Sequence, residues 1–255
     1  MSTSDLEAVA KDLGQAWANA TAIPAPSRQN PSMTTEDAYR IQELIVAERM
    51  SDGRQKAGWK LGLTSAEAPA TPIVGTLLSD MVLASGAELA LTTMVTPMVE
   101  AEIVVRIGKA IDRPQSVDEL LSGPHEIGPG LEVIDYRTID SVGVIDWIAD
   151  NSTVAYAVVG RFVPISEVDP AGIEVTLSGG GHSLAAGRGE QVMGNPVAAV
   201  AWLSGHLAAR GQHLQRGDVV LTGSLTGHHR VYPADLAEFS ADFGSLGTVT
   251  VSFRA

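Results

Sequence analysis

Two glutamates occupy a stretch of the chain that is otherwise apolar. Glu100 and Glu102 lie within residues 97–107, a run rich in valine and isoleucine that no glycine or proline interrupts after Pro97. Such a run predicts a β-strand, and because strand side chains alternate, both carboxylates share one face. Two ionised carboxylates roughly 5–7 Å apart in a half-buried setting repel by about 2–4 kcal/mol, so a positive group is expected between them.

A second acidic strand narrows the choice of that positive group. The glutamate pair alone fits a solvated face, an arginine or lysine bridge, or a bound divalent cation. Glu132 lies in another short apolar run, residues 130–135. Three carboxylates with no cysteine or histidine beside them form an all-oxygen ligand set, which favours a hard cation such as Mg²⁺ or Mn²⁺. The sequence therefore predicts a metal site formed by Glu100, Glu102 and Glu132.

A lysine and an aspartate are further candidates for acid and base chemistry. Lys60 lies in a short strand bracketed by glycines, between Trp59 and Leu61. It is either a solvated lysine or one that its apolar neighbours desolvate, which would lower its pKa into a useful range. Asp80 follows the apolar pair at residues 77–78 and is either a turn residue or a site carboxylate.

Two polar segments could line a site. Four polar residues in succession, 150–153, interrupt an apolar run, which indicates either a loop tip or a polar site. The strand at residues 219–222 ends in Gly223 and Ser224, and this glycine either lets the backbone approach a ligand or forms a plain turn. The histidines show no metal-ligand spacing and are expected to be structural or exposed: His125, His182, His206, His213, His228 and His229.

Composition and missing motifs exclude several classes of function. The 255 residues carry a formal net charge of −13, which argues against binding to nucleic acid or to an anionic membrane. The absence of cysteine rules out disulfides and thiolate catalysis. There is no Walker loop, dinucleotide fingerprint or G-x-S-x-G motif. No run reaches the length of a membrane span and the N-terminus has no signal-peptide pattern, so a cytoplasmic location is expected.

The elements that must position these residues divide the chain unequally. Capping patterns predict a helix from Ser4 to about residue 20 and another over residues 36–50, after Thr34 or Thr35. Residues 66–76 are expected to be a loop, and the second half is mainly β apart from a helix that starts at Asn195. We therefore expect an α+β fold, with a helical N-terminal subdomain and first strand over residues 1–75 and a β-rich catalytic domain over residues 76–255.

A series of short motifs runs along nearly the whole chain. They lie at residues 38–42, 58–65, 77–81, 97–103, 131–135, 149–151, 187–189, 194–196 and 217–224. In this order they resemble the 2-hydroxypentadienoate hydratase and 4-oxalocrotonate decarboxylase family of the fumarylacetoacetate hydrolase superfamily. The resemblance implies that superfamily's mixed β-roll with a small helical N-terminal part. It also implies a homo-oligomer, and it leaves open a complex with a neighbouring enzyme of the same pathway.

The resemblance assigns roles to the candidate residues. It implies that Glu100, Glu102 and Glu132 bind Mg²⁺ or Mn²⁺ and that Lys60 is the acid or base. Asp80 and Asp150 are further catalytic candidates. The remaining candidates are expected to contact substrate or water: Asn151, Thr153, Thr222, Gly223 and Ser224.

The implied activity is addition of water to a 2-hydroxy-2,4-dienoate, which gives a 4-hydroxy-2-oxo acid in the catabolism of aromatic compounds or sterols. Decarboxylation of a 4-oxalocrotonate-type 2-oxo acid is the alternative, followed by C–C bond hydrolysis and by a non-catalytic partner subunit. Three departures from the family pattern concern the substrate end of the site. Residues 151–153 read Asn-Ser-Thr where Asn-Ala-Ser is common, the 66–75 loop is shorter than usual, and residues 226–232 lack small apolar residues.

Overall fold

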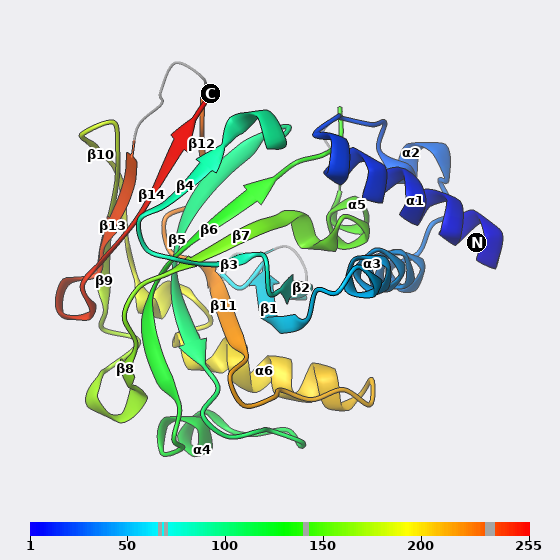
Figure 1. Ribbon diagram of the computed structural model, residues 1–255. Coiled ribbons are helices and arrows are strands. Elements are labelled where there is room, and N and C mark those ends of the chain that lie inside the picture. Colours follow the sequence, from blue (N-terminus) through cyan, green and yellow to red (C-terminus); the bar gives the residue numbers. More distant parts are fainter. Residues whose placement is uncertain (66–67, 69–70, 140–142, 233–237) are drawn as a thin grey trace.

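The long strands that carry the glutamates lie in the middle of a nine-stranded sheet (Figure 1). The computed structural model describes residues 1–255 apart from 66–67, 69–70, 140–142 and 233–237. The main path of the sheet follows the order β2 (Ile73–Leu78), β1 (Lys56–Gly62), β11 (Val219–Ser224), β5 (Pro97–Arg106), β6 (Glu126–Asp135), β7 (Val154–Val159) and β3 (Val82–Ala84). Two short strands extend it, β12 (His229–Arg230) beside β5 and β8 (Val163–Pro164) beside β6.

A five-stranded sheet packs against this one. Its order is β10 (His182–Arg188), β9 (Glu174–Gly179), β13 (Glu238–Asp242), β14 (Thr248–Arg254) and β4 (Ala87–Ala90). Strands β13 and β14 contact β6, and apolar side chains of both sheets form the largest buried cluster. Phe239 and Phe253 meet edge to face inside this cluster. Alternating apolar residues on β5 and β6 thus have partners on the neighbouring sheet, which explains why the sequence there is so hydrophobic.

Helices cover the ends and one side of the large sheet. They are α1 (Thr3–Asn19), α2 (Pro26–Gln29), α3 (Thr35–Ser51), α4 (Val117–Leu121), α5 (Val144–Ala149) and α6 (Pro196–Ala208). Helices α1, α2, α3 and α5 gather at one side, and α6 packs on β11 and β5 (Figure 1). The 3₁₀ turns are η1 (Leu91–Thr93), η2 (Asn151–Thr153), η3 (Ile165–Glu167), η4 (Gly189–Gln191) and η5 (Gly244–Leu246). No helix within the described residues is both long and apolar enough to cross a membrane.

The helix boundaries follow from their caps, with one difference from the sequence prediction. Thr34, one of the two predicted candidates, caps α3, and Asn195 caps α6 as predicted. Helix α1 begins earlier than expected, because the hydroxyl of Ser2 accepts the backbone N–H of Asp5 and the Asp5 carboxylate accepts the backbone N–H of Ser2. This reciprocal pair forms a complete capping box, so the predicted box at Ser4 is wrong.

The helices and the two sheets confirm the α+β fold class. The predicted division at residue 75 falls inside β2, which also shortens the expected loop at residues 66–76. Strand β1 pairs with both β2 and β11 and so belongs to the large sheet. Residues 66–67 and 69–70 of the predicted loop lie outside the described residues. A buried cluster that contains Leu13, Ile41, Ile73 and Ile148 joins the helices to the edge of this sheet.

Candidate metal centre

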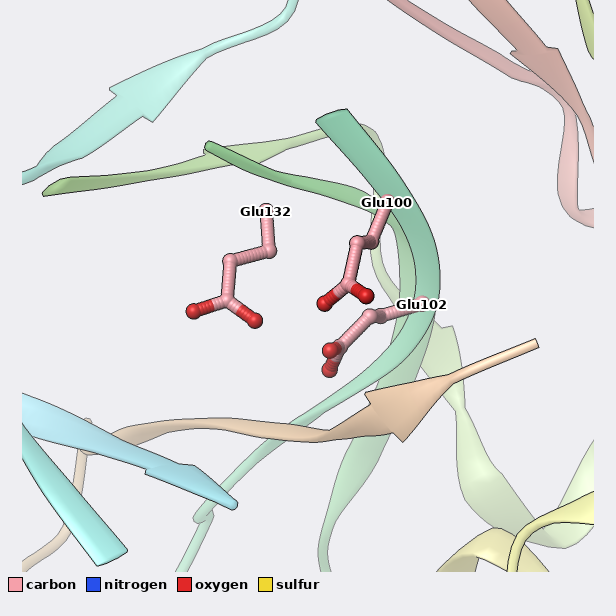
Figure 2. A group of neighbouring side chains, drawn as sticks. All are labelled: Glu100, Glu102 and Glu132. Carbon is pink, nitrogen blue, oxygen red and sulfur yellow. The ribbon is translucent and has the colours of Figure 1, made fainter. Parts of the chain in front are cut away.

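Three glutamates converge at the middle of the large sheet. In the antiparallel pair of β5 and β6, Glu100 lies directly opposite Glu132, and Glu102 is two residues further along the same face. Each side chain offers one carboxylate oxygen, and these oxygens lie within 4.8 Å of one another (Figure 2). Glu102 and Glu132 have no exposed surface. The alternation predicted from the sequence therefore places two strands' carboxylates around one point.

Within the described residues, Lys60 forms the shortest ion pair with this cluster. From β1, its Nζ lies 3.3 Å from Glu132 Oε1 and donates a 2.9 Å hydrogen bond to the carbonyl of Ser152. Burial lowers the pKa of Lys60, but Glu132, Glu100 and Glu102 raise it, and the result lies above the ordinary value. Of the two alternatives left open by the sequence, Lys60 is buried and not solvated, but its pKa is not lowered, because three carboxylates face the one ammonium group.

The single positive charge of Lys60 does not balance the negative charge of three carboxylates. Burial, followed by the charges of Glu132 and Glu100, raises the pKa of Glu102 well above its usual range. Burial likewise raises the pKa of Glu132 to about 7, although Lys60 opposes the rise. Holding all three groups ionised at neutral pH thus requires more positive charge than the chain itself supplies here.

The donor set fits a hard divalent cation. Glu102 Oε1 and Glu132 Oε2 are buried and have no hydrogen-bond partner, whereas buried polar atoms are normally paired. Glu102 Oε2 accepts a 2.7 Å hydrogen bond from the backbone N–H of Gly223, which orients the carboxylate and leaves Oε1 free. Oxygen ligands that carry net negative charge suit Mg²⁺ or Mn²⁺.

Gly223 positions one of the three glutamates. Its φ of +118° disfavours any other residue, and a Cβ there would lie 1.8 Å from Thr64 Oγ1. The glycine lets β11 approach Thr64 while its N–H reaches Glu102. Gly223 was expected to bind substrate, and in the structure its backbone N–H binds the Glu102 carboxylate.

A cavity of about 260 Å³ opens beside the cluster. Among the predicted site residues, those that line it are Lys60, Glu100, Glu102, Thr153 and Ser224. Ser224 Oγ is buried without a hydrogen-bond partner and Thr153 Oγ1 donates to the carbonyl of Ser152 at 2.7 Å. The remaining lining residues are Leu61, Gly62, Leu63, Thr64, Ser65, Ile73, Ile134, Tyr136, Trp147, Ser152 and His228.

Asp80 does not reach this cavity. Its carboxylate pairs with Arg49 at 2.8 Å and Arg54 at 2.7 Å, and 39% of the side chain is exposed. It lines a different hollow, together with both of these arginines. The predicted catalytic role of Asp80 is corrected to that of a surface ion-pair partner.

The side chains of three more predicted residues form hydrogen bonds within the protein. Asp150 Oδ1 accepts from Arg137 Nε at 2.8 Å, and burial raises its pKa to about 6 although Arg137 lowers it. Asn151 accepts the backbone N–H of Thr76 and donates to the carbonyl of the same residue. Thr222 Oγ1 donates to the carbonyl of Ile103 at 2.8 Å. None of the three lines the cavity, so direct substrate contact by Asp150, Asn151 and Thr222 is not supported.

Asp150 and Asn151 instead hold the turn that orients Lys60. The η2 residues have positive φ, 50° at Asn151, 51° at Ser152 and 60° at Thr153. Such values are unfavourable for residues other than glycine. The side-chain hydrogen bonds on Asp150 and Asn151 stabilise this backbone, and Gly75 leaves space for it, because a Cβ there would lie 2.6 Å from the Asn151 carbonyl. The turn thereby presents the Ser152 carbonyl to the ammonium group.

Sequence reasoning missed several residues of the cavity wall. Tyr136 continues the alternation of Glu132 and Ile134 on one face of the chain, a signal that was present in the sequence. Trp147 lies three residues before the polar segment 150–153 that the sequence had singled out. His228, expected to be structural or exposed, lines the cavity with its Nδ1 3.9 Å from Glu100 Oε1. Its position depends on β12 lying beside β5, which no local pattern indicated.

Comparison with known families decides the classification. Residues 49–254 match the family model described as "Fumarylacetoacetate (FAA) hydrolase C-terminal". The chain belongs to the fumarylacetoacetate hydrolase family. This family membership confirms the resemblance seen in the ordered motifs, and the three glutamates, Lys60 and the cavity all lie within the matched region.

Relatives within the fumarylacetoacetate hydrolase family span the whole chain. A 2-keto-4-pentenoate hydratase of Paraburkholderia xenovorans is 31% identical over 268 residues, covering 100% of this chain and 97% of the relative. A 4-oxalocrotonate decarboxylase of Pseudomonas putida is 30% identical and covers 96% of each chain. The predicted hydratase and its decarboxylase alternative thus both appear among the named relatives.

Solved structures confirm the family fold. The 4-oxalocrotonate decarboxylase of Pseudomonas putida G7, complexed with magnesium and adipate, superposes with a TM-score of 0.94 at 28% identity, over 100% of this chain and 99% of that one. A fumarylpyruvate hydrolase of Pseudomonas aeruginosa shares the fold at a TM-score of 0.60, over 76% of this chain and 88% of the other. The latter, at 19% identity, bears on the fold alone.

Proposed function

We propose that this chain is a divalent-metal-dependent hydratase that adds water to a 2-hydroxypenta-2,4-dienoate-type substrate in aromatic or sterol catabolism. One observation carries the proposal: the three convergent glutamates, with unpartnered buried oxygens, lie beside Lys60 at a small cavity. The full-length relatives named 2-keto-4-pentenoate hydratase support the choice of reaction.

Glu100, Glu102 and Glu132 would hold the ion, Mg²⁺ or Mn²⁺. A fold neighbour that is complexed with magnesium supports a divalent ion for this chain. When bound, such an ion supplies Lewis acidity to the carboxylate and adjacent oxygen of a 2-oxo acid. The Gly223 N–H contributes by keeping Glu102 aimed at the site.

Lys60 is placed to move protons. The first step turns the dienol into a 2-oxo-3-enoate: the C2 hydroxyl releases a proton, and C5 takes one up. Lys60 is buried beside Glu132, its ammonium group is suited to donate at C5, and the Ser152 carbonyl fixes its direction. Water then adds its hydroxyl at C4 and a proton at C3, which gives the 4-hydroxy-2-oxo acid. The Ser224 and Thr153 hydroxyls in the cavity wall are available to orient substrate or water.

Decarboxylation of a 4-oxalocrotonate-type acid is the second candidate. The superposition at a TM-score of 0.94 on a 4-oxalocrotonate decarboxylase favours it. Both reactions require a chelated 2-oxo acid head and a proton donor, so the same residues would serve either. A homo-oligomer, and a complex with a neighbouring pathway enzyme, remain predictions that light scattering and co-purification can test.

The test is to incubate the purified protein and Mg²⁺ with each substrate in turn. We expect 2-hydroxypenta-2,4-dienoate to lose its dienol absorbance and give 4-hydroxy-2-oxopentanoate by NMR. Release of CO₂ from 4-oxalocrotonate, with no hydration of the dienoate, would establish the decarboxylase instead. A protein that binds Mg²⁺ but turns over neither substrate would be a non-catalytic partner subunit.

A further inference from the structure

The N-terminal helices α1, α2 and α3 gather with α5 at one side of the large sheet (Figure 1). They supply no wall of the cavity beside the glutamates, since none of its described lining residues precedes Lys60. Helix α2 contacts α5 instead, and α3 contacts both α5 and η2. The η2 turn presents the Ser152 carbonyl to the Lys60 ammonium group at 2.9 Å. The contacts that these helices make with α5 and η2 therefore bear on the position of Lys60.

Gln42 joins α3 to the sheet and to α5 through one buried amide. Only 5% of this residue is exposed. Its Nε2 donates to the carbonyl of Val74 in β2 and to the carbonyl of Ile148 in α5, both at 2.9 Å. Carbonyls in the last turn of a helix lack partners within that helix, so Gln42 satisfies one of them. Because α5 ends at Ala149, this bridge fixes the turn that leads into η2.

Trp17 in α1 reaches the same segment through Arg137. The Arg137 guanidinium lies 4.2 Å from the centre of the Trp17 ring, and the Arg49 guanidinium of α3 lies 3.8 Å from it. The Arg137 side chain has no exposed surface, and it donates to the carboxylate of Asp150 at 2.8 Å and to its carbonyl at 3.2 Å. Cation–π contacts are stronger when they are desolvated. The ring of Trp17 thus holds the guanidinium that binds the residue before η2.

Helix α2 adds a third contact, at the first turn of α5. Ser27 donates its backbone N–H at 2.8 Å and its hydroxyl at 2.6 Å to the carboxylate of Asp146, which is buried. Each of the three N-terminal helices therefore contributes to holding residues 146–150. The positive φ values of η2 are unfavourable, and such backbone persists only where its surroundings hold it.

We propose that the N-terminal helices position Lys60 for proton transfer, with Gln42 as the main positioning residue and Trp17 as the second. Loss of either contact lets α5 and η2 relax, and the Ser152 carbonyl then no longer directs the ammonium group. The proposal rests on the proposed function, because it takes Lys60 as the proton donor. It assigns a role in the reaction to residues that do not line the cavity.

Gln42→Met tests the bridge, because methionine is of similar size and has no N–H to donate. We expect kcat to fall about 10–100-fold, while KM and the affinity for Mg²⁺ keep their wild-type values. Thr34→Ala is the matched control: it removes the cap of the same helix and lowers stability, but Thr34 contacts neither carbonyl that Gln42 binds. Wild-type kcat in folded Gln42→Met, or an equal loss of kcat in Thr34→Ala, would overturn the proposal.

Hydrogen exchange of the backbone over residues 144–153 gives a readout that needs no turnover. In the metal-free protein, Gln42→Met and Trp17→Leu should each exchange faster over this segment than the wild type, and Thr34→Ala should not. Trp17→Leu decides the question if Gln42→Met does not fold, and its kcat should fall with KM unchanged. Exchange at the wild-type rate in the folded variants would overturn the proposal.

The two readouts separate failure of this proposal from failure of the proposed function. If the wild type turns over substrate and the folded variants keep its kcat, only the positioning role is wrong. If the wild type binds Mg²⁺ but turns over neither substrate, the proposed function fails. Faster exchange in the variants would then still show that the helices hold the turn at Lys60, and unchanged exchange would remove that claim as well.

Discussion

Two groups of buried charged side chains, the Arg137–Asp150 pair and the glutamate cluster with Lys60, differ in their balance of positive and negative charge. Arg137 and Asp150 form one ion pair, with Nε and Oδ1 2.8 Å apart and the guanidinium 4.2 Å over the ring of Trp17. In the glutamate cluster, three carboxylates share one ammonium group and two oxygens have no partner. The first group lies against the helices and the second opens onto a cavity. Both are buried, so burial alone does not distinguish them.

Charge balance separates a buried ionised group that stabilises the fold from one that binds a ligand. A buried pair of opposite charges is already compensated and fixes local structure, here the turn that holds Lys60. A buried excess of one sign is stable only if something outside the chain compensates it. We therefore assign chemistry to the glutamate cluster and a positioning role to Arg137 and Asp150.

Glu102→Gln should have the largest effect on activity. It removes a ligand charge, so turnover should fall at least about a hundredfold. The metal-free protein should not lose stability, because the substitution also relieves repulsion among the carboxylates. Turnover assays and thermal unfolding without metal check both statements, and wild-type turnover would contradict the assignment.

Lys60→Met should lower turnover by about 10²–10⁴-fold while Mg²⁺ binding is kept. The substitution removes the proton donor but none of the three ligands. Steady-state kinetics and Mg²⁺ titration of the same preparation separate the two properties. Turnover at the wild-type rate would remove Lys60 from the mechanism.

Arg137→Met tests the compensated group. It leaves Asp150 buried without its partner and should destabilise the protein by about 3–5 kcal/mol in denaturant unfolding. The double variant Arg137→Met with Asp150→Leu should recover much of this loss, since it leaves no unpaired charge. If the single variant were as stable as the wild type, the ion pair of Arg137 with Asp150 would not be what stabilises this turn.

Metal-free stability should fall as the pH rises from about 4.5 to about 7. The pKa of Glu132 is near 7 in the folded protein and close to 4.5 when unfolded, so the folded state holds this proton more tightly. Its stabilising effect is complete below the unfolded pKa and is lost as the pH rises through the folded one. Unfolding temperatures across this range, with Glu132→Gln as control, should show a slope that the variant flattens and saturating Mg²⁺ reverses. A flat wild-type profile would contradict the raised pKa.

Asp80→Asn should have the smallest effect. The ion pairs with Arg49 and Arg54 are partly exposed, so stability should change by less than about 1 kcal/mol. Turnover should be unchanged, because Asp80 lies outside the cavity. A large loss of turnover in a folded variant would restore Asp80 as a catalytic candidate.

Prediction from the sequence was most accurate for features that a few adjacent residues determine. The alternation of Glu100 and Glu102, the capping of α3 by Thr34 and the start of α6 at Asn195 all depend on a few adjacent residues. The family resemblance added the order of the motifs and hence the fold class. These features need no knowledge of distant contacts.

The errors arose where a distant partner decides what a polar side chain does. Asp80 is held by two arginines, Asp150 by Arg137 and Asn151 by the backbone of Thr76. No local pattern reveals such pairing across the chain. The direction of the Lys60 pKa shift could not be predicted for the same reason, since it depends on carboxylates from two other strands.

Calorimetric titration of Mg²⁺ into the chelator-treated protein tests the central claim most directly. Saturable uptake of about one ion per chain is expected in the wild type at pH 8, and this uptake should be lost in Glu102→Gln. Absence of uptake by the wild type, or equal uptake by the variant, would show that the three glutamates do not form a metal site.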